Sequence, residues 1–85
     1  MSETQTTYML DVRAIAPRER HPRIFALLDA LKAGEALILT NDHAPEPLRS
    51  HLTLTRPNQF DWEYLEDGPQ VWRVQIVRRA EPEGD

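Results

Sequence analysis

Residues 22–41 read PRIFALLDALKAGEALILTN, and this stretch decides the fold. Its first part places apolar side chains at the i, i+3, i+4 and i+7 spacing of an amphipathic helix, from Ile24 to Leu31. Gly34 then stands where a helix commonly stops. The residues that follow, Ala36–Asn41, are almost continuously apolar, which is typical of a strand covered on both faces or of a central strand. The stretch therefore predicts a helix followed by a buried strand.

The segments on either side complete the predicted fold. Tyr8–Arg13 alternates apolar and polar side chains and predicts a first strand. A loop over 14–20 leads to Pro22, which suits the first turn of the helix. Strand, helix and strand in this order form a β-α-β unit with parallel strands. The later segments are a short helix over 46–54 and a hairpin of two strands, 60–65 and 71–78, around Asp67-Gly68-Pro69. The predicted fold is an α/β two-layer sandwich (α+β) of order β-α-β-α-β-β, with two helices on one face of a mixed four-stranded sheet.

The composition limits the class of protein. With 85 residues the chain is long enough for one domain, which we place at 8–79, with flexible tails at 1–7 and 80–85. The absence of cysteine excludes disulfides, thiol nucleophiles and thiolate metal ligands. The formal net charge of −4 argues against binding to nucleic acid. No apolar run is long enough to span a membrane, so we expect a cytoplasmic protein.

The predicted topology indicates where a binding site would lie. In a β-α-β unit the carboxyl ends of both parallel strands meet at one edge of the sheet, and ligands commonly bind beyond such ends. The loops after the two strands carry His21 and His43, so this edge is the candidate site.

Two kinds of site are consistent with the side chains at this edge. An anion or ligand site would combine the two helix N-termini with Arg18, Arg20, His21, Arg23 and Asn41. A site for a divalent metal such as Zn, Fe or Cu would use His21, Asp42 and His43, with His51 as a weaker ligand.

A series of short motifs covers most of the chain. In order they are Leu10-Asp11-Val12-Arg13, Arg20-His21-Pro22, Gly34-Glu35, Asn41-Asp42-His43, Pro47-Leu48, Phe60-x-Trp62-x-Tyr64, Gly68-Pro69 and Trp72-Arg73-Val74. Together they resemble a bacterial family known as domain of unknown function 2249. The resemblance implies a fold like that of the TusA/SirA sulfur-carrier proteins and an association with hemerythrin-like domains. Where a sulfur carrier has Cys-Pro, however, this chain has His21-Pro22, and an imidazole cannot hold a persulfide.

These observations favour a binding protein over an enzyme. No nucleophile with an oriented base and no phosphate-binding loop is recognisable. The preferred hypothesis is a non-catalytic binding or regulatory module of a redox or metal-handling system, with its metal- or anion-binding edge at His21 and His43. Hemerythrin-like or other redox proteins would be its partners. Two alternatives remain open: a small carrier or enzyme that uses His21 in place of the sulfur-carrier cysteine, and a structural module that forms a homodimer.

Overall fold

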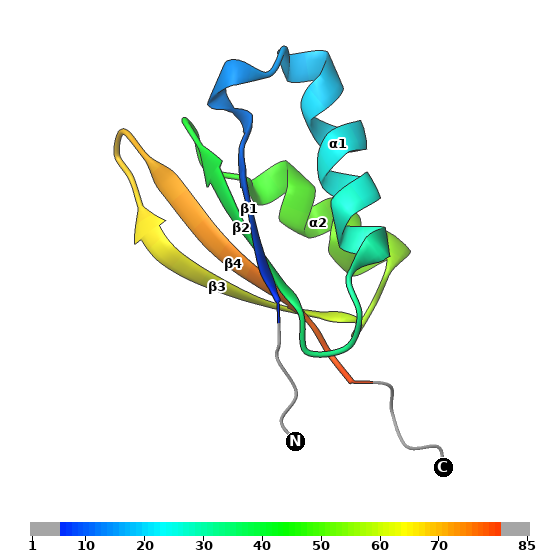
Figure 1. Ribbon diagram of the computed structural model, residues 1–85. Coiled ribbons are helices and arrows are strands. Elements are labelled where there is room, and N and C mark those ends of the chain that lie inside the picture. Colours follow the sequence, from blue (N-terminus) through cyan, green and yellow to red (C-terminus); the bar gives the residue numbers. More distant parts are fainter. Residues whose placement is uncertain (1–5, 81–85) are drawn as a thin grey trace.

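The helices and strands of the computed structural model, which describes residues 6–80, follow the predicted order (Figure 1). They are β1 (Thr7–Asp11), the 3-10 turn η1 (Val12–Ala14), α1 (Pro17–Ala30), β2 (Ala36–Asn41), α2 (Glu46–Thr55), β3 (Phe60–Asp67) and β4 (Trp72–Arg78). The predicted order β-α-β-α-β-β is therefore confirmed. None of the helices in the described part of the chain is long and apolar enough to cross a membrane.

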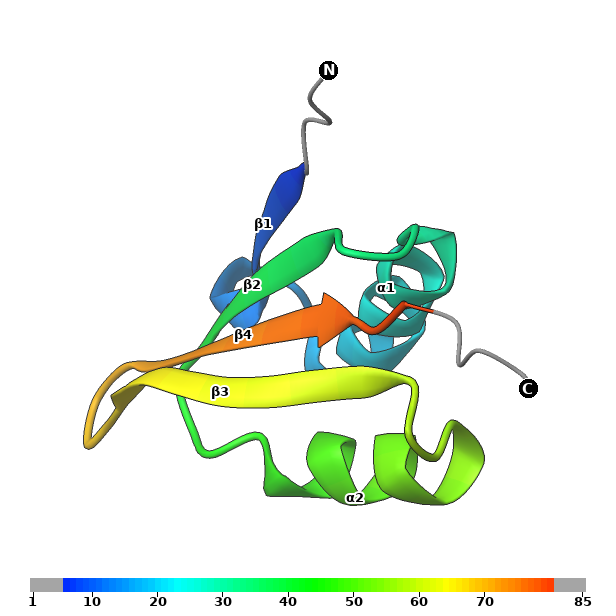
Figure 2. The same ribbon diagram turned by 90° about the horizontal axis from the view of Figure 1, so that it is seen from below.

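The four strands form one mixed sheet in the order β1-β2-β4-β3. β1 and β2 run parallel and are connected through α1, whereas β4 pairs antiparallel with both β2 and β3. Both helices cover the same face of this sheet (Figure 2). Because β1 and β2 are parallel, their carboxyl ends lie at one edge, which is at the top of Figure 1.

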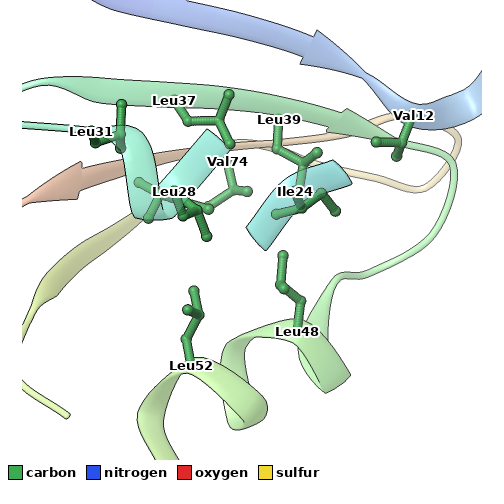
Figure 3. Packing of buried hydrophobic residues seen from close by; sticks show 10 residues of the cluster. Val12, Ile24, Leu28, Leu31, Leu37, Leu39, Leu48, Leu52 and Val74 are labelled. Carbon is green, nitrogen blue, oxygen red and sulfur yellow. The ribbon is translucent and has the colours of Figure 1, made fainter. Parts of the chain in front are cut away.

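The core lies between the sheet and the two helices (Figure 3). Leu37 and Leu39 of β2 point toward the helices and are fully buried. Apolar side chains of α1, α2 and β4 meet them there. The buried cluster consists of Val12, Ile24, Leu28, Leu31, Leu37, Leu39, Leu48, Leu52, Val74 and Ile76. The aromatic residues Phe60, Trp62 and Tyr64 of β3 pack against this cluster, so they serve the core.

The first helix begins earlier than the sequence predicted. It starts at Pro17, and the predicted start, Pro22, lies inside it. Pro17 fits the first helical position because an N–H group there would have no partner within the helix. Pro22 has no N–H group, so the carbonyl of Arg18, four residues earlier, receives no helical hydrogen bond from it. The sequence could not show which proline begins the helix, because either fits a first turn.

The first strand ends at Asp11, two residues before its predicted end at Arg13. The Asp11 carboxylate accepts hydrogen bonds from the backbone N–H of Arg13 at 3.0 Å and from its guanidinium at 2.9 and 2.6 Å. The hydrogen bond from the Arg13 side chain is the largest cause of a lowered pKa of Asp11, and with the backbone bond it brings this pKa to about 2. They cap the turn η1, which leads the chain out of the sheet toward α1.

The predicted tails are only partly within the described residues. Thr7, which the sequence assigned to the N-terminal tail, is the first residue of β1 and is aligned with Ala36 of β2. The backbone pairing extends one residue further, because the N–H of Ala36 donates to the carbonyl of Thr6 at 3.1 Å. The remainder of the predicted tails, 1–5 and 81–85, lies outside the described residues.

Candidate functional site

Two loops that are far apart in the sequence meet at the carboxyl ends of β1 and β2. A pocket of about 110 Å³ lies between them, bordered by the first turns of both helices, and we call it the helix-start pocket. It is lined by Pro17, Arg20, His21, Ile24, Asn41, His43, Pro45, Pro47 and Leu48. The structure thus brings together four of the side chains that the sequence placed at this edge, namely Arg20, His21, Asn41 and His43.

Arg20 connects the two loops. Its Nε donates to the carbonyl of Ile15 at 2.9 Å, just before α1, and its Nη1 donates to Oδ1 of Asn41 at 3.3 Å, at the end of β2. A longer bond of 3.4 Å reaches the half-exposed Asp42. The Arg20 side chain is only 11% exposed, so its positive charge is held in a fixed place at the pocket wall.

We expect Arg20→Ala to lower the free energy of unfolding by about 1–3 kcal/mol, because the Ile15 carbonyl and the buried Asn41 amide each lose a charged partner. The bond to Asp42 adds little, because that carboxylate is well solvated. Urea denaturation followed by circular dichroism measures the loss. Arg18→Ala, an exposed change on the same helix, is the matched control and should stay within about 0.5 kcal/mol of wild type. Equal stability of the two variants would contradict the connecting role of Arg20.

Asp42 and His43 form a pair at the mouth of the pocket. Nδ1 of His43 lies 2.8 Å from Oδ1 of Asp42. The pKa of Asp42 is lowered, chiefly by this hydrogen bond and further by the positive charge of Arg20. Among residues 6–80 no hydroxyl group forms a hydrogen bond with an imidazole, so the Asp–His pair has no nucleophile beside it.

His51 belongs to a different cluster. Its ring lies 4.8 Å from that of Phe25 and 6.5 Å from that of His21, measured between centroids. His21 in turn lies 6.1 Å from Phe25. The three rings pack between α1 and α2, so His21 borders both this aromatic cluster and the helix-start pocket, whereas His51 is absent from the pocket lining.

The predicted metal site is not assembled. Within the part of the chain that the structure describes, no group of three or more His, Cys, Asp or Glu side chains could hold a metal ion. The reason is that the expected ligands separate into two clusters. His43 pairs with Asp42, whereas His21 lies with His51 beside Phe25.

The predicted arginine cluster is also divided. Arg18 and Arg23 are exposed and border a shallow hollow on the outer surface of α1, together with Pro22. Because α1 begins at Pro17, these residues are helical, and successive helical side chains point in different directions. Of the three arginines predicted for the site, only Arg20 lines the helix-start pocket.

Prolines at the two helix starts belong to the pocket lining, although the sequence placed no proline in the candidate site. Pro17, Pro45 and Pro47 all line the pocket, and none of them has an N–H group to donate. The two helix starts therefore offer fewer backbone donors than the general rule for helix N-termini suggests. A ligand in this pocket must be recognised mainly by side chains, those of Arg20, His21 and His43 being the available ones.

Residues 9–78 match the model of a family described as "Uncharacterized conserved protein (DUF2249)". The matched region contains both helices and nearly all of the four strands. No curated protein and no solved structure matches the chain at a significant level.

Proposed function

The chain belongs to the family of uncharacterised conserved proteins called DUF2249, whose description assigns no function. We propose that it is a non-catalytic module that binds a small anion in the helix-start pocket. One observation carries the proposal. Arg20 and His21 come from α1, and Asn41 and His43 come from the end of β2 and the loop after it, yet all four line a single pocket.

The size of the pocket limits the ligand. A volume of about 110 Å³ is room for a small ligand only. An inorganic oxyanion or a short carboxylate fits this space. A nucleotide does not, because pockets for ligands of that size usually measure about 300–1,000 Å³.

The chemistry of the pocket wall favours a negative charge. The Arg20 guanidinium supplies a fixed positive charge, and the imidazole of His21 supplies an N–H donor, whereas the Nδ1 of His43 is engaged with Asp42. Ile24 and Leu48 are buried and form an apolar part of the wall, where the local dielectric is lower and a charged hydrogen bond is stronger than in water.

The proposal of binding without catalysis is supported by the surroundings of the Asp42–His43 pair. A nucleophilic mechanism needs a hydroxyl or thiol within reach of the imidazole, and the chain has no cysteine. The hydroxyls of Thr53 and Thr55 on α2 donate instead to backbone carbonyls of their own helix.

We further propose that the module regulates a redox or metal-handling system in the cytoplasm, with hemerythrin-like or other redox proteins as partners. The support is the resemblance described above, which implies an association with hemerythrin-like domains. A ligand in the helix-start pocket would alter the charge between the two helix starts, which is how binding could be communicated to a partner.

The proposal is tested by titrating the protein with inorganic phosphate, sulfate and acetate and following the amide and imidazole signals by NMR. We expect at least one anion to give saturable shifts at His21 and His43, and His21→Gln or His43→Gln to weaken its binding by about tenfold. His51→Gln is the matched control, because it makes the same change outside the pocket. Binding that the His21→Gln/His43→Gln double variant leaves unchanged, or the absence of any saturable shift at the pocket, would refute the proposal.

A further inference from the structure

A second hollow, of about 390 Å³, lies along the other end of α2. It is formed by the last turns of α2, the loop after this helix and the beginning of β3, which lie side by side in Figures 1 and 2. We call it the α2–β3 cleft. The side chains that determine its chemistry are Arg49, Arg56, Asn58, Phe60, Trp62 and Arg79. It shares no residue with the helix-start pocket, so a ligand of the cleft is independent of the function proposed for that pocket.

The cleft is positively charged, although the chain as a whole has a formal net charge of −4. Its lining contains three arginines and a single carboxylate, that of Asp61. Asp61 pairs with Arg79, and Asp29 outside the lining pairs with Arg56, so the excess positive charge is that of Arg49. A local excess of positive charge on an acidic protein attracts a negatively charged ligand specifically to that place.

Two of the three arginines have hydrogen-bond donors to spare. Within residues 6–80, the side chain of Arg49 forms no hydrogen bond or ion pair, and its guanidinium lies 5.8 Å from the centroid of the Trp62 ring. Nε of Arg79 donates to Asp61 at 2.7 Å, and its Nη groups have no partner in this part of the chain. Free guanidinium donors of this kind are suited to carboxylate and phosphate oxygens.

Arg56 has a supporting role. Its Nε and Nη2 donate to Asp29 at 2.8 and 2.9 Å, and its Nη1 donates to Thr55 at 3.1 Å, so all of its nitrogens are engaged. It is also the C-cap residue of α2, where its charge offsets the negative end of the helix dipole.

The opposite wall of the cleft is aromatic. Phe60 and Trp62 project from β3 on the face that carries the helices, and both are half-buried. The guanidinium of Arg49 lies over the Trp62 ring and that of Arg78 lies over the Phe60 ring, so the surface open to a planar ring is the outer face of the exposed Arg49 guanidinium. Asn58 lines the same cleft and adds an amide, which both donates and accepts hydrogen bonds.

We propose that the α2–β3 cleft binds a planar organic anion, that is, an aromatic or heteroaromatic ring that carries a phosphate or a carboxylate. The free donors of Arg49 and Arg79 account for the negative charge, and the outer face of the Arg49 guanidinium, backed by Trp62, accounts for the ring. A volume of about 390 Å³ lies within the usual range of about 300–1,000 Å³ for pockets that hold organic ligands. The helix-start pocket, with about 110 Å³, is smaller and takes only the smaller anions.

The test is an NMR titration with two probes: AMP, a heteroaromatic phosphate, and 4-hydroxybenzoate, an aromatic carboxylate. Adenosine and inorganic phosphate serve as probes with only the ring or only the charge. The two indole N–H signals report on different places, because Trp62 lies in the cleft and Trp72 lies beside the β3–β4 turn. We expect AMP or 4-hydroxybenzoate to shift the signals of Trp62 and Asn58 saturably.

Variants assign the binding to the cleft. Arg49→Gln should weaken binding of the active probe by about tenfold, because it removes the arginine with the most free donors. Arg18→Gln makes the same charge change on the surface of α1 and should leave the affinity unchanged. The inference is overturned if neither probe shifts the cleft signals, if Arg49→Gln binds as wild type does, or if adenosine or phosphate alone binds as tightly as the full probe. Shifts confined to His21 and His43 would support the helix-start pocket but would equally overturn the assignment of the cleft.

Discussion

Leu28→Ala is expected to lower the free energy of unfolding by about 3–5 kcal/mol, the largest loss of any single substitution predicted for this protein. Leu28 is fully buried and lies between the sheet and α2, facing Leu37, Val74 and Leu52 (Figure 3). Removing its side chain leaves a cavity between the sheet and α2, which the neighbouring side chains can fill only in part. A domain of this size has a total stability of about 5–15 kcal/mol, so the loss is a large fraction of it.

The measurement for Leu28→Ala is urea or thermal denaturation, with an expected fall in melting temperature of about 12–40 °C. Leu54→Ala is the matched control. Leu54 lies on α2 with 81% of its surface exposed, so the same deletion should change stability by no more than about 0.5 kcal/mol. Similar losses for the two variants would show that Leu28 is not part of a closely packed core.

Gly68→Ala is expected to cost about 2–4 kcal/mol. Gly68 in the turn between β3 and β4 has a φ of 88°, a left-handed conformation that an alanine adopts only with strain. A Cβ at this position would also lie 2.6 Å from Cζ2 and 2.7 Å from Cε2 of Trp72, which is closer than such atoms approach in proteins. The backbone and the ring therefore both oppose the substitution.

A double-mutant cycle separates these two causes. Trp72→Phe removes the outer ring of the indole, so in that background Gly68→Ala should cost only about 1–2 kcal/mol, the part due to the backbone. Chemical denaturation of the four proteins of the cycle supplies the free energies. If Gly68→Ala costs the same in the Trp72→Phe background as in the wild-type protein, the contact with the ring has no energetic role.

The candidate sites differ in how far the sequence could predict them. Spacing alone placed His21 and His43 at one sheet edge, because parallel strands bring their carboxyl ends together. Spacing could not show that His21 packs beside Phe25, since side-chain direction depends on the exact start of α1. It also could not show that His43 pairs with Asp42, since these two residues lie in the loop after β2. The predicted metal ligands are therefore not gathered into one group within the described residues.

The α2–β3 cleft could not be predicted in the same way. Arg49 lies in the middle of α2 and Arg79 follows β4, so no local motif contains both. They come together because the antiparallel pairing aligns the end of β4 with the start of β3, beside the end of α2. Clusters of this kind depend on which distant strands pair, and a local sequence pattern does not show this.

The sequence by itself determined the order of the elements, the buried face of each and the turn at Gly68. These features follow from local causes, namely the periodicity of apolar side chains and the conformational range of glycine and proline. The tertiary structure alone decided which of Pro17 and Pro22 begins α1, which arginines reach a pocket, and which side chains meet across the helices. Those outcomes depend on the rotation and packing of whole elements, where a shift of one residue on a helix turns a side chain by about 100° and moves it from a pocket to the solvent.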